Sequence, residues 1–336
     1  MGIDCGTQVI LCDIPIHLDT YEGCSHACKY CFVKRKHGIA VVNPKHCKKQ
    51  LLNFINGSRT TKTEWCDWKI PLHWGAMSDP FQPAESRHKA SLELLEVFAE
   101  TKYPFVVSSK GRLAITEPYL SLFRKCNCVY QISAICSKLD KIEEGAPSFE
   151  ERLHICDVIS KAVPRVIIRI QPYFRECKQD VLKNLQRFKD AGAYGVVIES
   201  MKYTSKKPGL VKIGGDFTYP IDLLKRDFQD IKNQAHAVGL RFFVGENRLR
   251  KMGDSFCCCG IEGLKGFKGN DFNLSHLMNG DNVCPTENMK RCGGRAFTSL
   301  FQESIMYDFC KNHTFEYMMR YYGKKPFVKD VLTERK

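Results

Sequence analysis

Three cysteines lie close together near the start of the chain, in the stretch GCSHACKYCF. Cys24, Cys28 and Cys31 follow the spacing Cys-x3-Cys-x2-Cys. Their thiol groups allow three interpretations. They are buried residues on one helical face, or a zinc site completed by His26 or His37, or the ligands of three irons in a four-iron, four-sulfur cluster.

The residues around the triplet favour the iron–sulfur interpretation. Gly23, Ser25 and mostly polar neighbours argue against a buried helical face. Structural zinc sites normally use four protein ligands, and the usual pairs of Cys-x2-Cys units are absent from this stretch. A compact loop can instead hold three corners of a cubane cluster and leave the fourth iron open.

An open iron would allow one particular kind of radical chemistry. S-adenosylmethionine can chelate such an iron through its amino and carboxylate groups. An electron from the cluster then cleaves a carbon–sulfur bond, which yields methionine and a 5′-deoxyadenosyl radical that abstracts hydrogen from a substrate. The electron would come from an external donor such as a flavodoxin or a ferredoxin.

The elements that must position this loop follow from the hydrophobic pattern of residues 10–250. Short apolar runs alternate with amphipathic helices, which predicts a parallel sheet covered by helices. We expect a partial (β/α)6-type barrel, with a doubly wound open sheet as the alternative. Functional loops of a barrel leave the C-terminal ends of its strands, and the triplet follows the first candidate strand. The candidate strands are 14–18, 69–74, 105–109, 129–135, 165–170, 195–200 and 241–245.

The chain of 336 residues is 43% apolar and carries a net charge of +14. This composition predicts a sizeable core and a basic surface, which suits either a polyanion such as nucleic acid or simple solubility. A basic run, Lys34 to His37, follows the triplet and would contact phosphates or lie in a solvated loop. The chain has no apolar run of membrane-spanning length and no signal-peptide pattern, so we expect a cytoplasmic location.

A second group of cysteines occurs after residue 250, where glycine and asparagine become frequent and apolar periodicity is lost. We therefore divide the chain into a barrel at 1–250 and a cysteine-rich extension at 251–336. We expect an auxiliary iron–sulfur cluster here, with structural zinc and unligated thiols as the alternatives. Its candidate ligands are Cys257, Cys258, Cys259, Cys284 and Cys292. Four other cysteines, Cys126, Cys128, Cys136 and Cys156, have apolar neighbours and are expected in the core.

The sequence resembles the radical S-adenosylmethionine superfamily, whose cysteine motif has an aromatic residue before the last cysteine, here Tyr30. The likeness is greatest to the branch of spore photoproduct lyase and DNA-repair-photolyase-like proteins, across residues 10–200. It rests on GCSHACKYCF, on MSDPFQP at 77–83, on VVSSK ending at Lys110, on QISAI with Ser133, and on EEGAPSFEERL at 143–153.

The resemblance implies a role for each matching residue. Cys24, Cys28 and Cys31 would bind the cluster, and Tyr30 would contact adenine. Ser78 would contact polar groups of the cofactor, Lys110 its carboxylate, and Ser133 its methionine or ribose part. From position alone we add Arg169 and Gln171 as cofactor-binding residues. Structural alternatives are a polar strand residue for Ser133 and an internal ion pair for Arg169.

Two residues depart from the lyase pattern. The lyase has a cysteine hydrogen donor where this chain has Ala76, and a tyrosine where it has Phe32. Neither replacement offers a readily abstracted hydrogen, so thymine photoproduct repair by the lyase's route is not expected. We expect radical chemistry on nucleic acid, in repair or base modification. The alternatives are a peptide or small-molecule substrate, and a non-catalytic, metal-stabilised nucleic-acid-binding protein.

Overall fold

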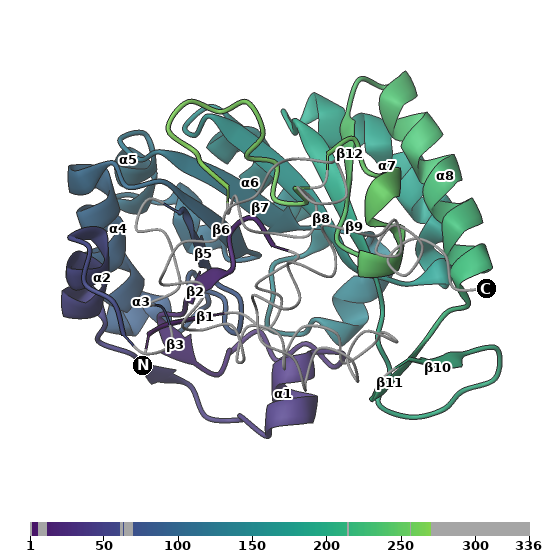
Figure 1. Cartoon of the computed structure of the whole chain (residues 1–336), viewed down its shortest axis with the longest axis horizontal. Coiled ribbons are helices and arrows are strands. Elements are labelled where there is room, and N and C mark those ends of the chain that lie inside the picture. Colours follow the sequence, from purple (N-terminus) through teal and green to yellow (C-terminus); the bar gives the residue numbers. More distant parts are fainter. Residues whose placement is uncertain are drawn as a thin grey trace, which may run out of the picture.

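The computed structural model describes residues 2–5, 12–60, 63, 70–213, 215–255 and 257–269. Among these residues, one sheet of eight strands dominates, in the order β1-β2-β5-β6-β7-β8-β9-β12 (Figure 1). The strands are β1 (Ile3–Cys5), β2 (Ile16–Leu18), β5 (Leu72–Trp74), β6 (Phe105–Ser109), β7 (Cys128–Ser133), β8 (Arg165–Tyr173), β9 (Gly195–Ser200) and β12 (Arg241–Val244).

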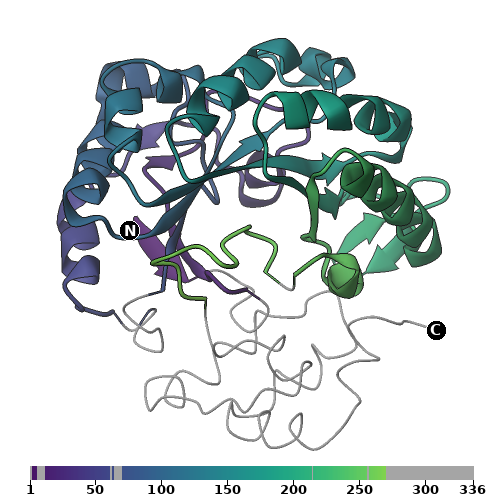
Figure 2. The ribbon, with the colours of Figure 1, turned by 90° about the horizontal axis from the view of Figure 1, so that it is seen from above.

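The strand order distinguishes the two expected folds. From β2 to β12 all neighbours are parallel and follow one another in chain order, and β1 adds an antiparallel edge. A doubly wound sheet would reverse its strand order at a switch point, and this sheet does not. Figure 2 shows the sheet strongly curved, with helices on its convex side. The prediction of a partial β/α barrel is confirmed.

Helices cover the outside of the barrel because each has one apolar face. In α7, for example, Val181, Leu185 and Phe188 recur at helical spacing and are fully buried. A capping box begins α6, with the Ser148 hydroxyl accepting from the backbone N–H of Glu151. The α-helices are α1 (Phe32–His37), α2 (Lys48–Ile55), α3 (Glu85–His88), α4 (Ala90–Thr101), α5 (Tyr119–Phe123), α6 (Phe149–Ser160), α7 (Lys178–Asp190) and α8 (Ile221–Ala237). Within the described ranges, none of these helices combines the length and apolar character needed to cross a bilayer.

Smaller elements complete the described chain. Two short antiparallel pairs, β3 (Tyr21–Glu22) with β4 (Asn43–Pro44) and β10 (Val211–Ile213) with β11 (Asp216–Thr218), lie outside the main sheet. Sequence analysis did not predict these pairs, which are two or three residues long. Short 3₁₀ helices occupy Arg112–Ile115, Ser137–Ile142, Arg175–Cys177 and Asn247–Met252.

The main hydrophobic core lies between the sheet and its helices. Trp74 is fully buried there and its ring packs against Phe81, Phe98 and Phe105. Trp74 is therefore a core residue, whereas Trp65 and Trp68 lie outside the described residues. The four cysteines predicted for the core are all buried: Cys126, Cys128, Cys136 and Cys156.

A second, smaller apolar cluster fills the N-terminal end of the lumen. Its inward-facing members come from successive strands and include Val106, Val129 and Ile167. Residues 257–261 cover them, and the Arg165 guanidinium donates to the backbone oxygens of Gly260 and Glu262, the latter at 2.8 Å. Figure 2 shows this segment, in light green, running across the concave side of the sheet. Residues 257–261 thus share a core with the barrel, while the domain boundary at 250 stays a prediction because 270–336 lie outside the described residues.

Candidate active site

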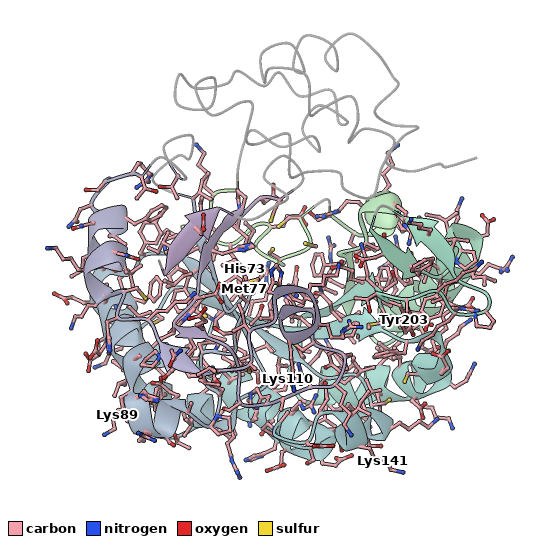
Figure 3. All side chains as sticks on the ribbon, turned by 90° about the horizontal axis from the view of Figure 1, so that it is seen from below. His73, Met77, Lys89, Lys110, Lys141 and Tyr203 are labelled. Atoms are coloured by element: carbon pink, nitrogen blue, oxygen red, sulfur yellow. The ribbon has the colours of Figure 1, made fainter. Side chains whose placement is uncertain are left out.

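One cavity of about 500 Å³ occupies the lumen of the barrel. Cys24, Cys28 and Cys31 line it near the C-terminal ends of the strands, and Cys258 and Cys259 line it near the N-terminal ends. Figure 3 shows Met77 and Lys110 toward the middle of the barrel, whereas Lys89 lies at its periphery. The cavity also brings together all six predicted cofactor-binding residues: Tyr30, Ser78, Lys110, Ser133, Arg169 and Gln171.

The triplet occupies a loop between β3 and α1 that distant residues hold in place. The ring of His26 is buried, with Nδ1 at 2.8 Å from the backbone oxygen of Gly145 and Nε2 at 3.1 Å from Asp79 Oδ2. The backbone N–H of Ser25 donates to Gln82 Oε1 at 2.6 Å. Because both ring nitrogens of His26 already have partners, the structure disfavours His26 as a zinc ligand.

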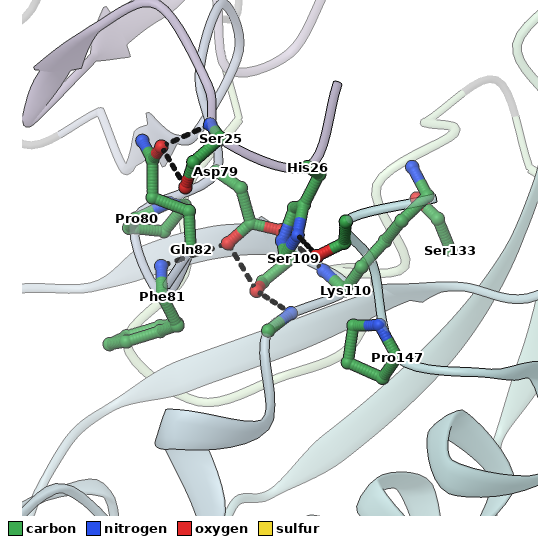
Figure 4. Close-up of polar contacts among 12 residues, drawn as sticks. Ser25, His26, Asp79, Pro80, Phe81, Gln82, Ser109, Lys110, Ser133 and Pro147 are labelled. Atoms are coloured by element: carbon green, nitrogen blue, oxygen red, sulfur yellow. Dashed lines mark hydrogen bonds and ion pairs between the residues drawn. The ribbon is translucent and has the colours of Figure 1, made fainter. Parts of the chain in front are cut away.

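Asp79 is the centre of the contacts drawn in Figure 4. Besides His26, its carboxylate accepts from the Ser109 hydroxyl at 2.6 Å and from the backbone N–H of Lys110 at 2.6 Å. Burial opposes ionisation of this carboxyl, but His26 and these hydrogen bonds lower the pKa of Asp79 to about 2. Asp79 was not among the predicted site residues, although it follows the predicted Ser78 directly in the stretch MSDPFQP.

Glu143 organises the other side of the loop. The Tyr30 hydroxyl and the Arg152 guanidinium both donate to its carboxylate, and the ammonium group of Lys110 lies 3.8 Å away. Burial opposes ionisation, but Lys110 and Arg152 lower the pKa of Glu143 below its ordinary value. Tyr30 and Lys110, both predicted to contact the cofactor, are therefore oriented by a buried carboxylate that sequence analysis missed. The signal for it was the stretch EEGAPSFEERL, which contains Glu143 and Arg152.

The two predicted serines lie on the cavity wall. Ser78 donates from its backbone N–H and its hydroxyl to Asp19 Oδ1, at 3.1 and 3.4 Å. Burial raises the pKa of Asp19 to about 6, against the opposing effect of these hydrogen bonds. Ser133 ends β7, and its backbone oxygen accepts from Arg152 Nη1 at 3.1 Å. Its side chain lines the cavity, as the resemblance implies for a cofactor contact.

A polar layer crosses the middle of the lumen. Arg169 Nη1 donates to Ser108 Oγ at 2.9 Å and to Gln131 Oε1 at 2.6 Å, and Nη2 donates to Gln171. Gln171 in turn donates a hydrogen bond from Nε2 to Glu199 Oε2 at 2.6 Å. The hydrogen-bond partners of Arg169 are thus neutral side chains, in contrast to the ion pair considered as its structural alternative. Arg169 lies near the cysteines of the floor described next.

The floor of the lumen gathers cysteines from both ends of the described chain. The Cys259 thiol lies within interacting distance of Cys12, Cys257 and Cys258, and the sulfurs of Cys258 and Cys259 are 4.0 Å apart. The neighbouring Cys259 thiol, with Arg250 and Arg169, lowers the pKa of Cys258 to about 6 against the effect of burial. Sequence analysis missed Cys12, which has no cysteine near it along the chain except Cys5. The other two predicted ligands, Cys284 and Cys292, lie outside the described residues.

The loop cysteines suit an iron–sulfur cluster by their chemistry and their common cavity. All three are free thiols, and all three open onto the same space as Tyr30 and Lys110. In the described part of the chain, no three His, Cys, Asp or Glu side chains are already arranged around one metal-ion position. Binding would therefore draw the thiols together, which is usual where metal binding and local ordering are coupled.

Proteins of known structure share this architecture. A spore photoproduct lyase variant solved with bound AdoMet and dinucleoside spore photoproduct superposes with a TM-score of 0.54 and 14% identity, over 69% of this chain and 76% of that one. This chain has the fold of spore photoproduct lyase. Streptococcus suis SuiB bound to the precursor peptide SuiA has a TM-score of 0.50 and 13% identity, over 69% and 49% of the two chains. The predicted resemblance is confirmed at the level of the fold.

Sequence comparison finds partial matches to mycobacterial proteins. Uncharacterised proteins of Mycobacterium tuberculosis and Mycobacterium bovis are 25% identical to this chain over 194 residues. The match covers 53% of this chain and 56% of each relative, so the chain spans about half the length of the curated relatives it matches. No protein-family profile matches the chain.

Proposed function

We propose that this protein is a radical S-adenosylmethionine enzyme that acts on nucleic acid. The observation that carries the first part is the common cavity: the three loop cysteines open onto it together with Tyr30, Ser78, Lys110 and Ser133. A cluster bound there would supply the electron that cleaves S-adenosylmethionine to methionine and a 5′-deoxyadenosyl radical. The fold shared with spore photoproduct lyase supports this assignment.

The residues of the cavity have distinct tasks in this proposal. Lys110, whose ammonium group is 3.8 Å from Glu143, would present a positive charge to the carboxylate of the bound methionine moiety. Tyr30 would lie against adenine, with its ring orientation held by Glu143. An external flavodoxin or ferredoxin would deliver the electron.

Nucleic acid as the substrate is supported by the basic rim of the cavity. Lys34, Arg35 and Lys36 are exposed on α1, directly after the cysteine loop, and the last two line the cavity, where Lys36 also pairs with Asp216. Arg35 Nη2 donates to the backbone oxygen of Lys202 at 3.3 Å, which brings another basic residue to the same rim. Cations beside a cavity favour a substrate with a phosphate backbone.

Two residues that differ from the lyase pattern limit the reactions that we expect of this protein. Ala76 and Phe32 line the cavity at the positions that the resemblance assigns to the lyase's hydrogen-return relay. We therefore propose hydrogen abstraction leading to repair or base modification without that relay. The second candidate is a peptide substrate, favoured by the structural likeness to SuiB, which was solved with a peptide bound.

The radical part is tested by product formation. Protein reconstituted with iron and sulfide in the absence of air should form 5′-deoxyadenosine and methionine from S-adenosylmethionine when dithionite is added. Cys24→Ala, Cys28→Ala and Cys31→Ala should each abolish this, and Cys126→Ala, which removes a core thiol remote from the cavity, should not. Undiminished cleavage by a loop variant would refute the assignment of the cluster.

The substrate part is tested by the salt dependence of binding. Replacing Lys34, Arg35 and Lys36 with glutamine should weaken DNA or RNA binding and reduce the slope of log K against log salt by about one for each lost phosphate contact. A matched control removes two lysines and one arginine from the outer helices, as Lys183→Gln, Lys225→Gln and Arg226→Gln. Equal effects of the two triple variants would contradict a specific basic rim, and negligible binding at low salt would leave the peptide as the better candidate.

A further inference from the structure

The floor of the lumen is built from two segments that are far apart in the sequence. Cys12 precedes β2, and Cys257, Cys258 and Cys259 follow the 3₁₀ helix Asn247–Met252. Ile14 packs in the same apolar cluster as Cys257 and Cys259, and Gln131 Nε2 donates to the backbone oxygen of Cys259 at 3.2 Å. These contacts hold the two segments against each other, so the proximity of their thiols is a property of the folded barrel.

One pair of these sulfurs has a separation close to that of two thiolates on one ion. Cys259 is the central thiol, within interacting distance of Cys12, Cys257 and Cys258. The Cys258 and Cys259 sulfurs are 4.0 Å apart. Two thiolates on one tetrahedral ion, with metal–sulfur bonds of about 2.3 Å, are separated by about 3.8 Å. Thiolates of a four-iron cluster each bind a different iron and therefore lie farther apart.

Two arginines and two carboxylates lie around these sulfurs. The guanidinium groups of Arg169 and Arg250 both interact electrostatically with Cys12, Cys258 and Cys259. Asp13 lies near Arg250 and Cys257, and Glu199 lies near Arg169, whose hydrogen-bond partners are neutral side chains. Cations in the shell around a metal site stabilise thiolate ligands, as hydrogen-bond donors around such sites do.

We propose that Cys12, Cys257, Cys258 and Cys259 form a second metal site that takes a single thiophilic ion such as Zn²⁺. The site differs from the auxiliary iron–sulfur cluster expected from sequence in its metal, in having Cys12 in place of Cys284 and Cys292, and in its place inside the barrel. The four sulfurs are not yet set around one point, so the ion would order them as it binds. The bound ion would tie residues 257–259 to the start of β2 and close the N-terminal end of the lumen. The inference is independent of the proposed radical chemistry.

The test uses the full chain with the loop triplet removed, as Cys24→Ala, Cys28→Ala and Cys31→Ala, so that the loop binds no metal. This background, purified without air and stripped of metal, should take up one Zn²⁺ per chain, and Co²⁺ should give the visible absorption of a tetrahedral thiolate site. Adding Cys12→Ser should remove this binding, whereas adding Cys126→Ala should leave it unchanged. Circular dichroism confirms that each variant is folded.

Two results would overturn the proposal. One is retention of Zn²⁺ by the Cys12→Ser chain together with its loss when Cys284 and Cys292 are replaced. The other is uptake of several irons with sulfide, rather than one zinc ion, by the background chain. Failure here leaves deoxyadenosine formation by the intact triplet untouched, so the two proposals fail separately.

A further test uses the unmutated chain, so that no substitution can affect the fold or the metal binding. Zn²⁺ should slow alkylation of Cys12, Cys258 and Cys259 by iodoacetamide at least about tenfold, as expected for thiolates held by a metal. Mass spectrometry locates the modified residues. Protection of Cys258 and Cys259 with an unprotected Cys12 would also overturn the proposal.

Discussion

The two cysteine sets lie at opposite ends of one lumen and are built in opposite ways. The loop set, Cys24, Cys28 and Cys31, comes from eight consecutive residues and is held by buried polar contacts to Asp79 and Glu143. The floor set joins Cys12 to Cys257–Cys259 and rests on apolar side chains of the strands. A short spacing motif therefore defines one set, and closure of the barrel defines the other. The polar layer around Arg169 separates them.

The largest expected difference between the two sets is in cofactor cleavage. Cys28→Ala should lower deoxyadenosine formation by about 1,000-fold or more, a barrier increase of about 4 kcal/mol, because a loop ligand is lost. Cys258→Ala should change it by no more than about threefold, since the floor does not contact the cofactor in our proposal. Product quantification by chromatography measures both. If Cys258→Ala formed as little deoxyadenosine as Cys28→Ala, the two cysteine sets would not differ in function as proposed.

Removing a buried polar contact that holds the cysteine loop should lower the stability of the fold. Glu143→Gln leaves the Arg152 guanidinium, itself 2% exposed, without its buried carboxylate, and should destabilise the fold by about 3 kcal/mol. Its neighbour provides the control, because Glu144 is 63% exposed and pairs with a 60% exposed Lys29. Glu144→Gln should cost less than about 0.5 kcal/mol. Denaturant titration of both variants tests the prediction, and comparable losses would show that Glu143 does not support the loop in this way.

Asp19, beside Ser78 on the loop side of the lumen, predicts a dependence of stability on pH. Its folded pKa of about 6 exceeds the ordinary 3.8, so the folded state holds this proton more tightly than the unfolded state does. The stability that protonation contributes is present at low pH and is lost as pH rises through 6. Asp19→Asn should therefore stabilise the protein by about 2 kcal/mol at pH 8 and by little at pH 4. Melting temperatures across this pH range measure the difference, and a constant offset between the two proteins would contradict it.

The apolar floor should depend less on any one polar contact. Arg165→Met removes the hydrogen bonds to Gly260 and Glu262 and the stacking of the guanidinium on Tyr194, at 3.8 Å from the ring centre. We expect a loss of about 1–2 kcal/mol, together with faster proteolysis after residue 250. Arg112→Gln, at a residue 74% exposed, is the control. If Arg165→Met leaves both stability and proteolysis unchanged, the apolar contacts alone hold residues 257–261.

Much of the fold could be predicted because its strands are local apolar patterns. The runs at 105–109 and 195–200 match β6 and β9 residue for residue, and both are buried on both faces. The capping box before α6 was also readable, since its two hydrogen bonds join residues three apart. Short elements such as β1 and the β10–β11 pair carry too few residues for a periodic signal, and they were missed.

By itself, the sequence determined the loop triplet, the order of strands and helices, and the resemblance to the lyase branch, because each is written in nearby residues. Only the tertiary structure decided that Asp79 reaches His26, that Glu143 joins Tyr30 to Arg152, and that Cys12 meets Cys259. These pairs are separated by many residues, and their contact depends on sheet register and on how far the barrel curves. A local sequence pattern cannot specify such a long-range contact, because the contact depends on the packing of every strand between the two residues.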